Sequence, residues 1–222
     1  MIELITKRFL LRDFVANDLP DFVAYHDDPR SLEFYGEVEA KPGHAQALFK
    51  VFSSWAEEQP RHHYQLAIVK RNEARSLVGC GGLRGDEAES DRAELGIELA
   101  PQYWGRYGYA IEPMLALVEF GFAQLGLKEI YGGTVSANHR IARIAKAFGA
   151  VAIARPTPDW MTARGWSQVE WQITREQWEK NRLDRPTWTS GGIRAKNYGC
   201  ELRGWIWTKS LSSGVLKPLT FH

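Results

Sequence analysis

The stretch RAELGIELAPQYWGRYGYAIEPMLALVEFGFAQL, residues 92–125, decides the fold because it joins a strand, a glycine loop and a helix. Residues 93–100 have the composition of a strand. Residues 112–126 have the spacing of a helix with one buried face, formed by Leu115, Val118, Phe122 and Leu125. Where a strand leads through small residues into a helix, backbone amides and the positive end of the helix dipole can face a phosphate.

The loop in this stretch permits two interpretations. Gly105 and Gly108 are small and can adopt positive φ, and Arg106 adds a positive charge between them. The pattern is neither a P-loop, which ends in Gly-Lys-Ser/Thr, nor a Gly-x-Gly-x-x-Gly fingerprint. On these residues alone, the loop is either a phosphate site or an ordinary turn from strand to helix.

The chain before this stretch predicts one strand, two helices and then further strands. We expect a strand over residues 8–14 and helices over residues 17–28 and 45–59. Strand-like runs follow at residues 64–70, 76–84 and 93–100, separated by turn residues, as in an antiparallel meander. Helices before and after three consecutive strands indicate a mixed α/β (α+β) domain rather than regular βαβ winding.

The chain after this stretch completes one domain, which we place at residues 1–183. A strand is expected over 128–135, a helix capped by Asn138 over 139–148, strands over 150–154 and 169–174, and a final helix over 175–183. Residues 184–222 have no sustained period, although Trp188, Trp205 and Trp207 make them unusually aromatic. We interpret them as a C-terminal extension that is poorly ordered or peripheral.

Composition excludes several classes of partner. The 222 residues carry a formal net charge of +1, so no broad positive field would attract nucleic acid or an anionic membrane. Cys80 and Cys200 lie far apart without metal-ligand spacing, which predicts no metal site and favours a reducing compartment. No apolar run has the length of a signal peptide core or a membrane span, so we expect a soluble, cytoplasmic protein.

Three segments together resemble one known family. WGRYGYAIE (residues 104–112) and KEIYGGTVSANHRIARIAKAFGA (128–150) resemble the acetyl-CoA-binding core of the GNAT superfamily of N-acetyltransferases. ITKRFLLRDFVANDLPDFVAYHDDP (5–29) is similar to the start of its ribosomal-protein N-acetyltransferase (RimJ/RimL-like) branch. The resemblance implies the GNAT fold, a central, mostly antiparallel mixed sheet that is flanked by helices and splays between its fourth and fifth strands. It also implies acetyl-CoA as co-substrate, with no metal.

The resemblance also assigns a cofactor site. The strand ending at Leu99 would pair its open backbone with the pantetheine arm, the loop amides would hold the pyrophosphate, and Asn138 would contact the arm. The cofactor-binding residues implied in this way are Leu99, Trp104, Gly105, Arg106, Tyr107, Gly108, Tyr109, Ala110 and Asn138. The chain departs from the branch pattern by one extra residue in the loop and by Ile141, where a serine is usual.

Two glutamates are candidates for the catalytic base. Glu94 and Glu98 flank Gly96 at even spacing, so both side chains lie on one face of the strand. Either carboxylate could take the proton of the attacking amine, or both could be ordinary ion-paired surface groups. The resemblance favours Glu94, since glutamates near this point of the fourth strand serve in parts of the family. No residue is assigned as the acid for the leaving thiolate.

The predicted function is therefore transfer of the acetyl group of acetyl-CoA to a primary amine by direct attack in a ternary complex. The acceptor could be a protein N-terminal α-amino group or a small-molecule amine. A third reading keeps the fold but makes the chain a non-catalytic acyl-CoA-binding module. A homodimer is compatible with all three.

Overall fold

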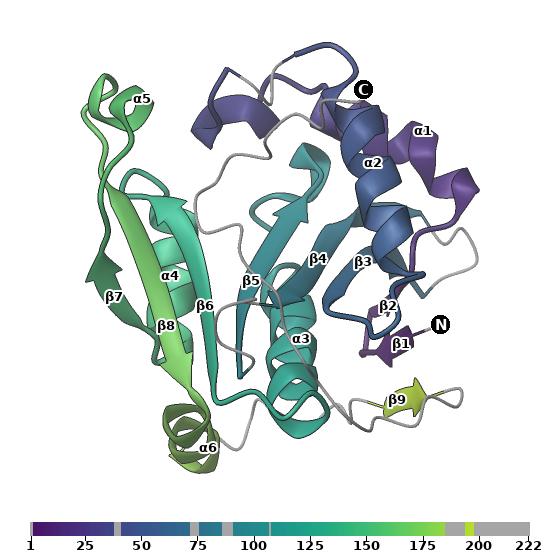
Figure 1. Ribbon diagram of the computed structural model, residues 1–222, viewed down its shortest axis with the longest axis vertical. Helices are drawn as coiled ribbons and strands as arrows, with labels where there is room; N and C mark the ends of the chain where they lie inside the picture. The colour runs from purple at the N-terminus through teal and green to yellow at the C-terminus, as the bar shows by residue number, and fades with distance from the viewer. Residues whose placement is uncertain are drawn as a thin grey trace.

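The computed structural model describes residues 2–37, 41–71, 76–85, 91–106, 108–184 and 194–197. Within these residues, nine strands form one sheet in the order β7-β8-β6-β5-β4-β3-β2-β1-β9 (Figure 1). The strands are β1 (Ile2–Ile5), β2 (Phe9–Arg12), β3 (His63–Lys70), β4 (Leu77–Gly85), β5 (Arg92–Leu99), β6 (Glu129–Val135), β7 (Val151–Ala154), β8 (Gln168–Thr174) and β9 (Arg194–Asn197). The helices are α1 (Leu19–His26), α2 (His44–Trp55), α3 (Ile111–Ala123), α4 (His139–Phe148), α5 (Asp159–Thr162) and α6 (Arg175–Asp184), with 3-10 turns η1 (Ala16–Asp18), η2 (Ser31–Phe34) and η3 (Pro101–Tyr103).

The sheet opens between β5 and β6. These two strands are parallel, and their ladder covers only Arg92 to Glu94 of β5, although β5 continues to Leu99 and β6 to Val135. Every other pair of neighbouring strands in the described sheet is antiparallel. The mixed, mostly antiparallel sheet with one splay is therefore confirmed. The diverging strands β5 and β6 correspond to the fourth and fifth of the predicted strands, because β1 was not among those predicted.

The strand expected over residues 8–14 is present as β2, but it is one half of a hairpin whose other strand, β1, was not predicted. Each of these strands is only four residues long. A run that short gives little periodicity to detect. The burial of Leu4 beside Leu11, its partner across the hairpin, pins the register.

The C-terminal extension is described only at β9, which pairs with β1 at the edge of the sheet. Apart from Asp184, the last residue of α6, the rest of the 184–222 segment, including Cys200 and the three tail tryptophans, lies outside the described residues. The proposed division of the chain at residue 183 stays a prediction.

The two faces of the sheet are covered by different helices. Gly81 of β4 faces α3, since a β-carbon there would lie 3.2 Å from a Leu117 methyl group. The preceding residue, Cys80, points to the opposite face of the sheet, where its sulfur lies 3.3 Å from the Tyr25 hydroxyl of α1. Helices α1 and α2 therefore cover one face of β2–β4, and α3 packs on the other; α4 lies beside β6 and β8 (Figure 1).

Helix α4 has the bounds that the sequence predicts, and α3 begins within one residue of its predicted start but ends three residues before Gly126. Pro113 is the third residue of α3, where a missing N–H costs nothing. The Asn138 side chain accepts a hydrogen bond from the Ile141 amide at 3.3 Å and caps α4. Gly126 and Gly149 follow α3 and α4 with φ of 73° and 84°, which favours glycine.

Removing the Phe22 ring should lower the free energy of unfolding strongly. Phe22 has no exposed surface, and its ring packs against Phe14, Phe49 and Phe52 beneath α1 and α2. We expect Phe22→Ala to cost about 3–5 kcal/mol in denaturant unfolding, since it leaves a cavity. Val15→Ala, at a side chain that is 42% exposed, is the control and should change stability by about 0.5 kcal/mol or less. Equal effects of the two substitutions would contradict this account of the core.

Candidate functional site

The end of β5 presents backbone groups toward the opening in the sheet. The Ala100 amide donates to the Val78 carbonyl at 2.8 Å, so this residue faces β4. Because backbone groups alternate in direction along a strand, those of Leu99 face the opposite side, toward β6. The ladder with β6 has already ended there. The Leu99 carbonyl accepts a hydrogen bond from Trp104 Nε1 at 2.6 Å, and the Leu99 amide lies where an incoming chain could pair with it.

The two loop glycines have different surroundings. Gly105 and Gly108 both have positive φ, 72° and 74°. Among the described residues, no heavy atom would lie within 4 Å of a β-carbon on Gly105, whereas a β-carbon on Gly108 would lie 2.5 Å from Nη2 of Arg8. Gly105 therefore borders open space that a ligand could approach closely, and Gly108 makes room for an arginine. Tyr107, between them in the predicted site, lies outside the described residues.

Positive charge gathers at this loop from distant parts of the chain. Arg106 lies over the Tyr103 ring at 5.4 Å, and Lys70 lies over the same ring at 4.7 Å. Arg8 forms an ion pair with Glu112 in the first turn of α3 at 2.6 Å and lies over the Tyr109 ring at 5.0 Å. The sequence predicted Arg106 but not Arg8 or Lys70, because only the pairing of β2, β3 and β4 brings those residues to the loop. This surrounding suits an anionic ligand such as a pyrophosphate.

The other side of the opening is formed by α4. The side-chain oxygen of Asn138 caps this helix. Arg140 lies over the Trp104 ring at 4.6 Å and pairs with Glu33 of η2 at 2.7 Å. The Trp104 ring, hydrogen-bonded to Leu99, thus links the end of β5 to the start of α4. Arg143 and Lys146 are exposed, as expected of a solvated helix face.

Glu94 and Glu98 share one face of β5, as predicted, but have different partners. The face continues onto β4, where Arg84 lies opposite Glu94 and Cys80 opposite Glu98. Glu94 forms an ion pair with Arg84 at 3.2 Å. The absence of a side chain at Gly96 leaves room for the guanidinium, whose Nη2 lies 2.7 Å from where a β-carbon would be. Burial acts to lower the pKa of Arg84, but the charges of Glu94 and Glu98 outweigh it, so the pKa is raised.

Glu98 lies among polar groups that sequence reasoning missed. The Tyr35 hydroxyl donates a hydrogen bond to Oε1 of Glu98, and Nε2 of His26 lies 3.2 Å from Oε2, without the alignment of a hydrogen bond. Burial lowers the pKa of His26, so its imidazole is neutral at pH 7. Burial and the charge of Glu98 raise the pKa of Tyr35 well above its usual value, so the phenol remains a donor. The Glu98 side chain still keeps 31% of its surface exposed.

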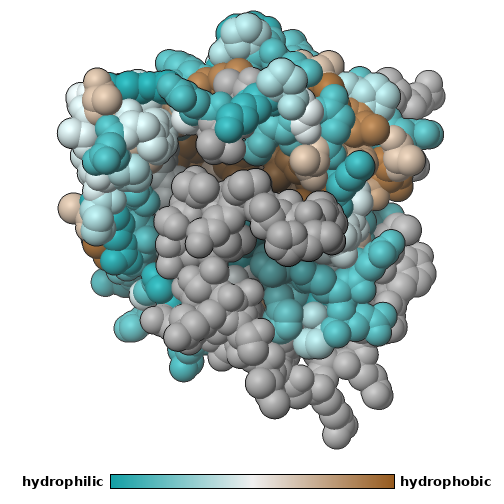
Figure 2. All heavy atoms as spheres, turned by 45° about the horizontal axis from the view of Figure 1, so that its top comes forward, coloured by the Kyte–Doolittle hydropathy of each residue, from teal (hydrophilic) through white to brown (hydrophobic). Residues whose placement is uncertain are grey.

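Tyr35 belongs to a segment that is held from the far side of the opening. Nη1 of Arg164 donates to the Tyr35 carbonyl at 3.0 Å, and the Phe34 ring lies 6.0 Å from the Trp166 ring. With the Glu33–Arg140 ion pair, these contacts join the segment between α1 and α2 to α4 and to the loop before β8. In Figure 2, which brings the top of Figure 1 forward by 45°, apolar side chains are visible beneath the hydrophilic residues at this end of the molecule.

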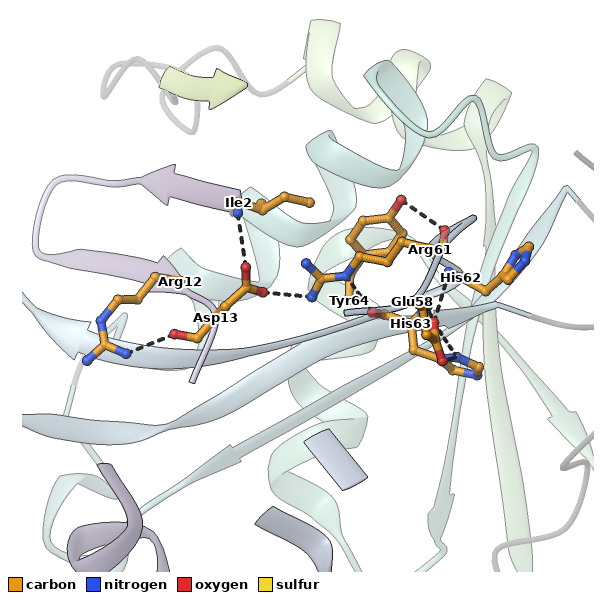
Figure 3. Close-up of polar contacts among 8 residues, drawn as sticks. All are labelled: Ile2, Arg12, Asp13, Glu58, Arg61, His62, His63 and Tyr64. Carbon is orange, nitrogen blue, oxygen red and sulfur yellow. Dashed lines mark hydrogen bonds and ion pairs between the residues drawn. The ribbon is translucent and has the colours of Figure 1, made fainter. Parts of the chain in front are cut away.

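The residues at the start of β3 form a structural tether (Figure 3). His62 and His63 donate backbone amides to Glu58, and the His63 ring lies 2.8 Å from the same carboxylate. Nη2 of Arg61 donates a hydrogen bond to Oδ1 of Asp13 at 2.7 Å, and the Arg61 carbonyl accepts one from the Tyr64 hydroxyl. These bonds fasten the start of β3 to the segment after β2, so the polar groups of His63 and Arg61 are used within the protein.

Cys80 is buried on the Glu98 face, and burial raises the pKa of its thiol to about 12, so it is not a nucleophile. In the described ranges, no group of three His, Cys, Asp or Glu side chains could hold a metal ion. Nor does any helix described here combine the length and apolar character needed to cross a membrane.

Comparison with known proteins identifies related sequences. Residues 8–151 match the family model described as acetyltransferase (GNAT) domain. An uncharacterized N-acetyltransferase, YoaA of Bacillus subtilis, is 29% identical over 125 residues, covering 56% of this chain and 69% of that protein. The FsC-acetyl coenzyme A-N(2)-transacetylase of Aspergillus fumigatus is 31% identical over 105 residues, covering 45% of this chain and 43% of its own length.

Solved structures share the fold. An acetyltransferase from Agrobacterium tumefaciens superposes with a TM-score of 0.61 at 24% identity, covering 78% of this chain and 94% of that one. A Vibrio cholerae protein whose name places it with the ribosomal-protein-serine acetyltransferases has a TM-score of 0.59 at 19% identity, covering 78% of this chain and 97% of that one. At these identities the superpositions describe the fold and not the substrate.

Substituting Gly105 should weaken acetyl-CoA binding without unfolding the domain. A valine side chain would occupy the open space beside the loop and block close approach of a phosphate to the backbone. We expect Gly105→Val to lower the affinity measured by calorimetry by roughly tenfold or more, the value of a lost charge-assisted hydrogen bond. Gly126→Val is a matched control, because Gly126 also has positive φ and open surroundings but lies at the other end of α3. Equal affinities of the two variants would show that the phosphate site is elsewhere.

Proposed function

Because this chain belongs to the GNAT family of acetyltransferases, we propose that it transfers the acetyl group of acetyl-CoA to a primary amine with Glu98 as general base. The observation that carries the proposal is the position of Glu98 at the open end of β5, one residue before Leu99. Glu94 lies where β5 is still paired with β6, opposite Tyr131. The geometry therefore favours Glu98 over Glu94, the reverse of the family-based preference.

The residues around the opening fit acetyl-CoA. The free backbone edge at Leu99 suits an extended amide-containing arm, and the loop with Gly105, Arg106 and nearby Arg8 suits the phosphates. Asn138 keeps its amide nitrogen available while its oxygen caps α4. When bound, acetyl-CoA supplies an activated acetyl group as a thioester.

The reaction would use groups of this chain as follows. Glu98 takes a proton from the acceptor amine, so that the nitrogen lone pair can attack the thioester carbon. The Leu99 amide donates a hydrogen bond to the carbonyl oxygen as negative charge develops on it. A C–N bond forms, the C–S bond breaks, and the thiolate of CoA leaves. The Tyr35 hydroxyl, which donates a hydrogen bond to Oε1, holds the Glu98 carboxylate in position throughout.

The acceptor is an open choice between two classes. The similarity to the ribosomal-protein N-acetyltransferase branch favours a protein N-terminus. The FsC-acetyl coenzyme A-N(2)-transacetylase of Aspergillus is, by its name, an enzyme for the N(2) position of FsC, which favours an acceptor other than a protein N-terminus. The polar network at Glu98 argues for catalysis rather than for acyl-CoA binding alone, since binding needs no ionisable group there.

Acetyl-CoA should stabilise the protein and support thiol release. At a concentration of 100 times Kd, a ligand that binds only the folded state adds about 2.7 kcal/mol. For a chain of this size that corresponds to a rise in Tm of roughly 5–10 °C. The same preparation, given a panel of primary amines, should release CoA thiol with at least one of them. A folded protein whose Tm does not respond to acetyl-CoA would overturn the proposal.

Substitution of the two glutamates should separate their roles. Glu98→Gln keeps the size of the side chain but cannot accept a proton, so we expect kcat to fall by roughly 10²- to 10⁴-fold. Acetyl-CoA affinity should stay within about twofold, because the side chain is not part of the phosphate loop. Glu94→Gln is the matched control and should keep kcat within about threefold. A larger loss in Glu94→Gln than in Glu98→Gln would return the base to Glu94.

A further inference from the structure

The side chain of Arg84, which keeps 30% of its surface exposed, has few protein partners for its guanidinium. Its Nε is buried without a hydrogen bond. Among the described residues, its contact with an acid is the single ion pair from Nη2 to Glu94, at 3.2 Å. A guanidinium has five N–H donors in a fixed fork, and buried donors are almost always paired in folded proteins. The buried, unpaired Nε of Arg84, in a side chain that stays partly open, could therefore be satisfied by a ligand with acceptor oxygens.

The position of these donors connects them to the proposed base. The guanidinium lies over Gly96, and Glu98 is two residues further along the same face of β5. At a rise of about 3.3 Å per residue, the two positions are about 7 Å apart. A short molecule with an ammonium group at one end and a carboxylate at the other can span this distance when each group makes a hydrogen bond of about 2.8 Å.

We propose that the acetyl acceptor is a free α-amino acid, whose amine meets Glu98 and whose carboxylate is bound by Arg84. The inference rests on the proposed acetyl transfer and adds the class of acceptor to it. Arg84 is then a specificity-determining residue. The missing side chain at Gly96 leaves the space that the Arg84 guanidinium occupies.

Charge favours a carboxylate over the neutral carbonyl of a protein N-terminus. Hydrogen bonds between two ionised groups are about twice as strong as those between neutral groups, and arginine binds carboxylates through two parallel N–H donors. Glu94 pairs with only one nitrogen of the Arg84 guanidinium, Nη2. The face carries two carboxyl side chains and one guanidinium, a composition that also attracts the ammonium form of the amine.

The test compares acceptors that differ only in the carboxylate. Each free amino acid of a panel is assayed against its α-carboxamide and against the corresponding amine without the carboxyl group, by release of CoA thiol. We expect kcat/KM for the preferred amino acid to exceed that of its carboxamide and its amine by roughly tenfold to a hundredfold. Arg84→Met should remove this difference, and Arg84→Lys should restore part of it. Arg155→Met removes an exposed charge paired with Glu170 and should leave the difference unchanged.

Calorimetry with the protein saturated in CoA gives a second readout that does not depend on turnover. The preferred amino acid should bind at least about tenfold more tightly than its carboxamide, and Arg84→Met should abolish this preference. Equal turnover or equal binding of acid, carboxamide and amine by the wild-type protein would overturn the inference, as would a preference that survives in Arg84→Met. If no amine releases thiol, the proposed function fails, and the binding comparison still decides the role of Arg84.

Discussion

The short parallel ladder between β5 and β6 is the constraint on which the rest of the site depends. A strand that stays paired on both edges has no free backbone to offer, and β5 loses its second partner after Glu94. The Leu95 carbonyl still lies beside Gly132 of β6, and beyond it the outward backbone groups up to Leu99 face the opening. Trp104 lies across this opening, bonded to the Leu99 carbonyl and stacked under Arg140 of α4, so the two halves of the sheet remain connected where they diverge.

The opening gives two residues of similar chemistry different roles. Glu94 and Glu98 are identical side chains on one face of one strand. Glu94 lies on the paired part of β5 and is neutralised by Arg84, its neighbour across the strand pair. Glu98 lies on the free part, where no arginine is opposite it and where Tyr35 and His26 meet its two oxygens. Distance along the strand from the end of the ladder, rather than residue type, separates a candidate base from an ion-paired carboxylate.

The Glu98 site is assembled from elements that are distant along the chain. Tyr35 comes from the connection between α1 and α2, and that connection is held by Arg140 and Arg164 from the C-terminal half. Surface ion pairs of this kind are individually weak. Here the ion pair of Glu33 acts together with a cation–π contact and a ring contact at Phe34 and a backbone hydrogen bond at Tyr35. These contacts on three consecutive residues together fix where the phenol lies.

The sequence by itself determined the elements with strong local signals. The helical stripes, the glycines after α3 and α4, the Asn138 cap and the three strands of the meander all follow from spacing and from backbone preferences within a few residues. The glycine loop and the even spacing of Glu94 and Glu98 were also readable, because both are local patterns. Only the tertiary structure decided which glutamate faces the opening, that Arg8 and Lys70 join the loop, and that Tyr35, His26 and Arg84 surround the glutamates. Those contacts depend on strand order and register, which bring together residues tens of positions apart, and a pattern read along one chain carries no record of which strands become neighbours.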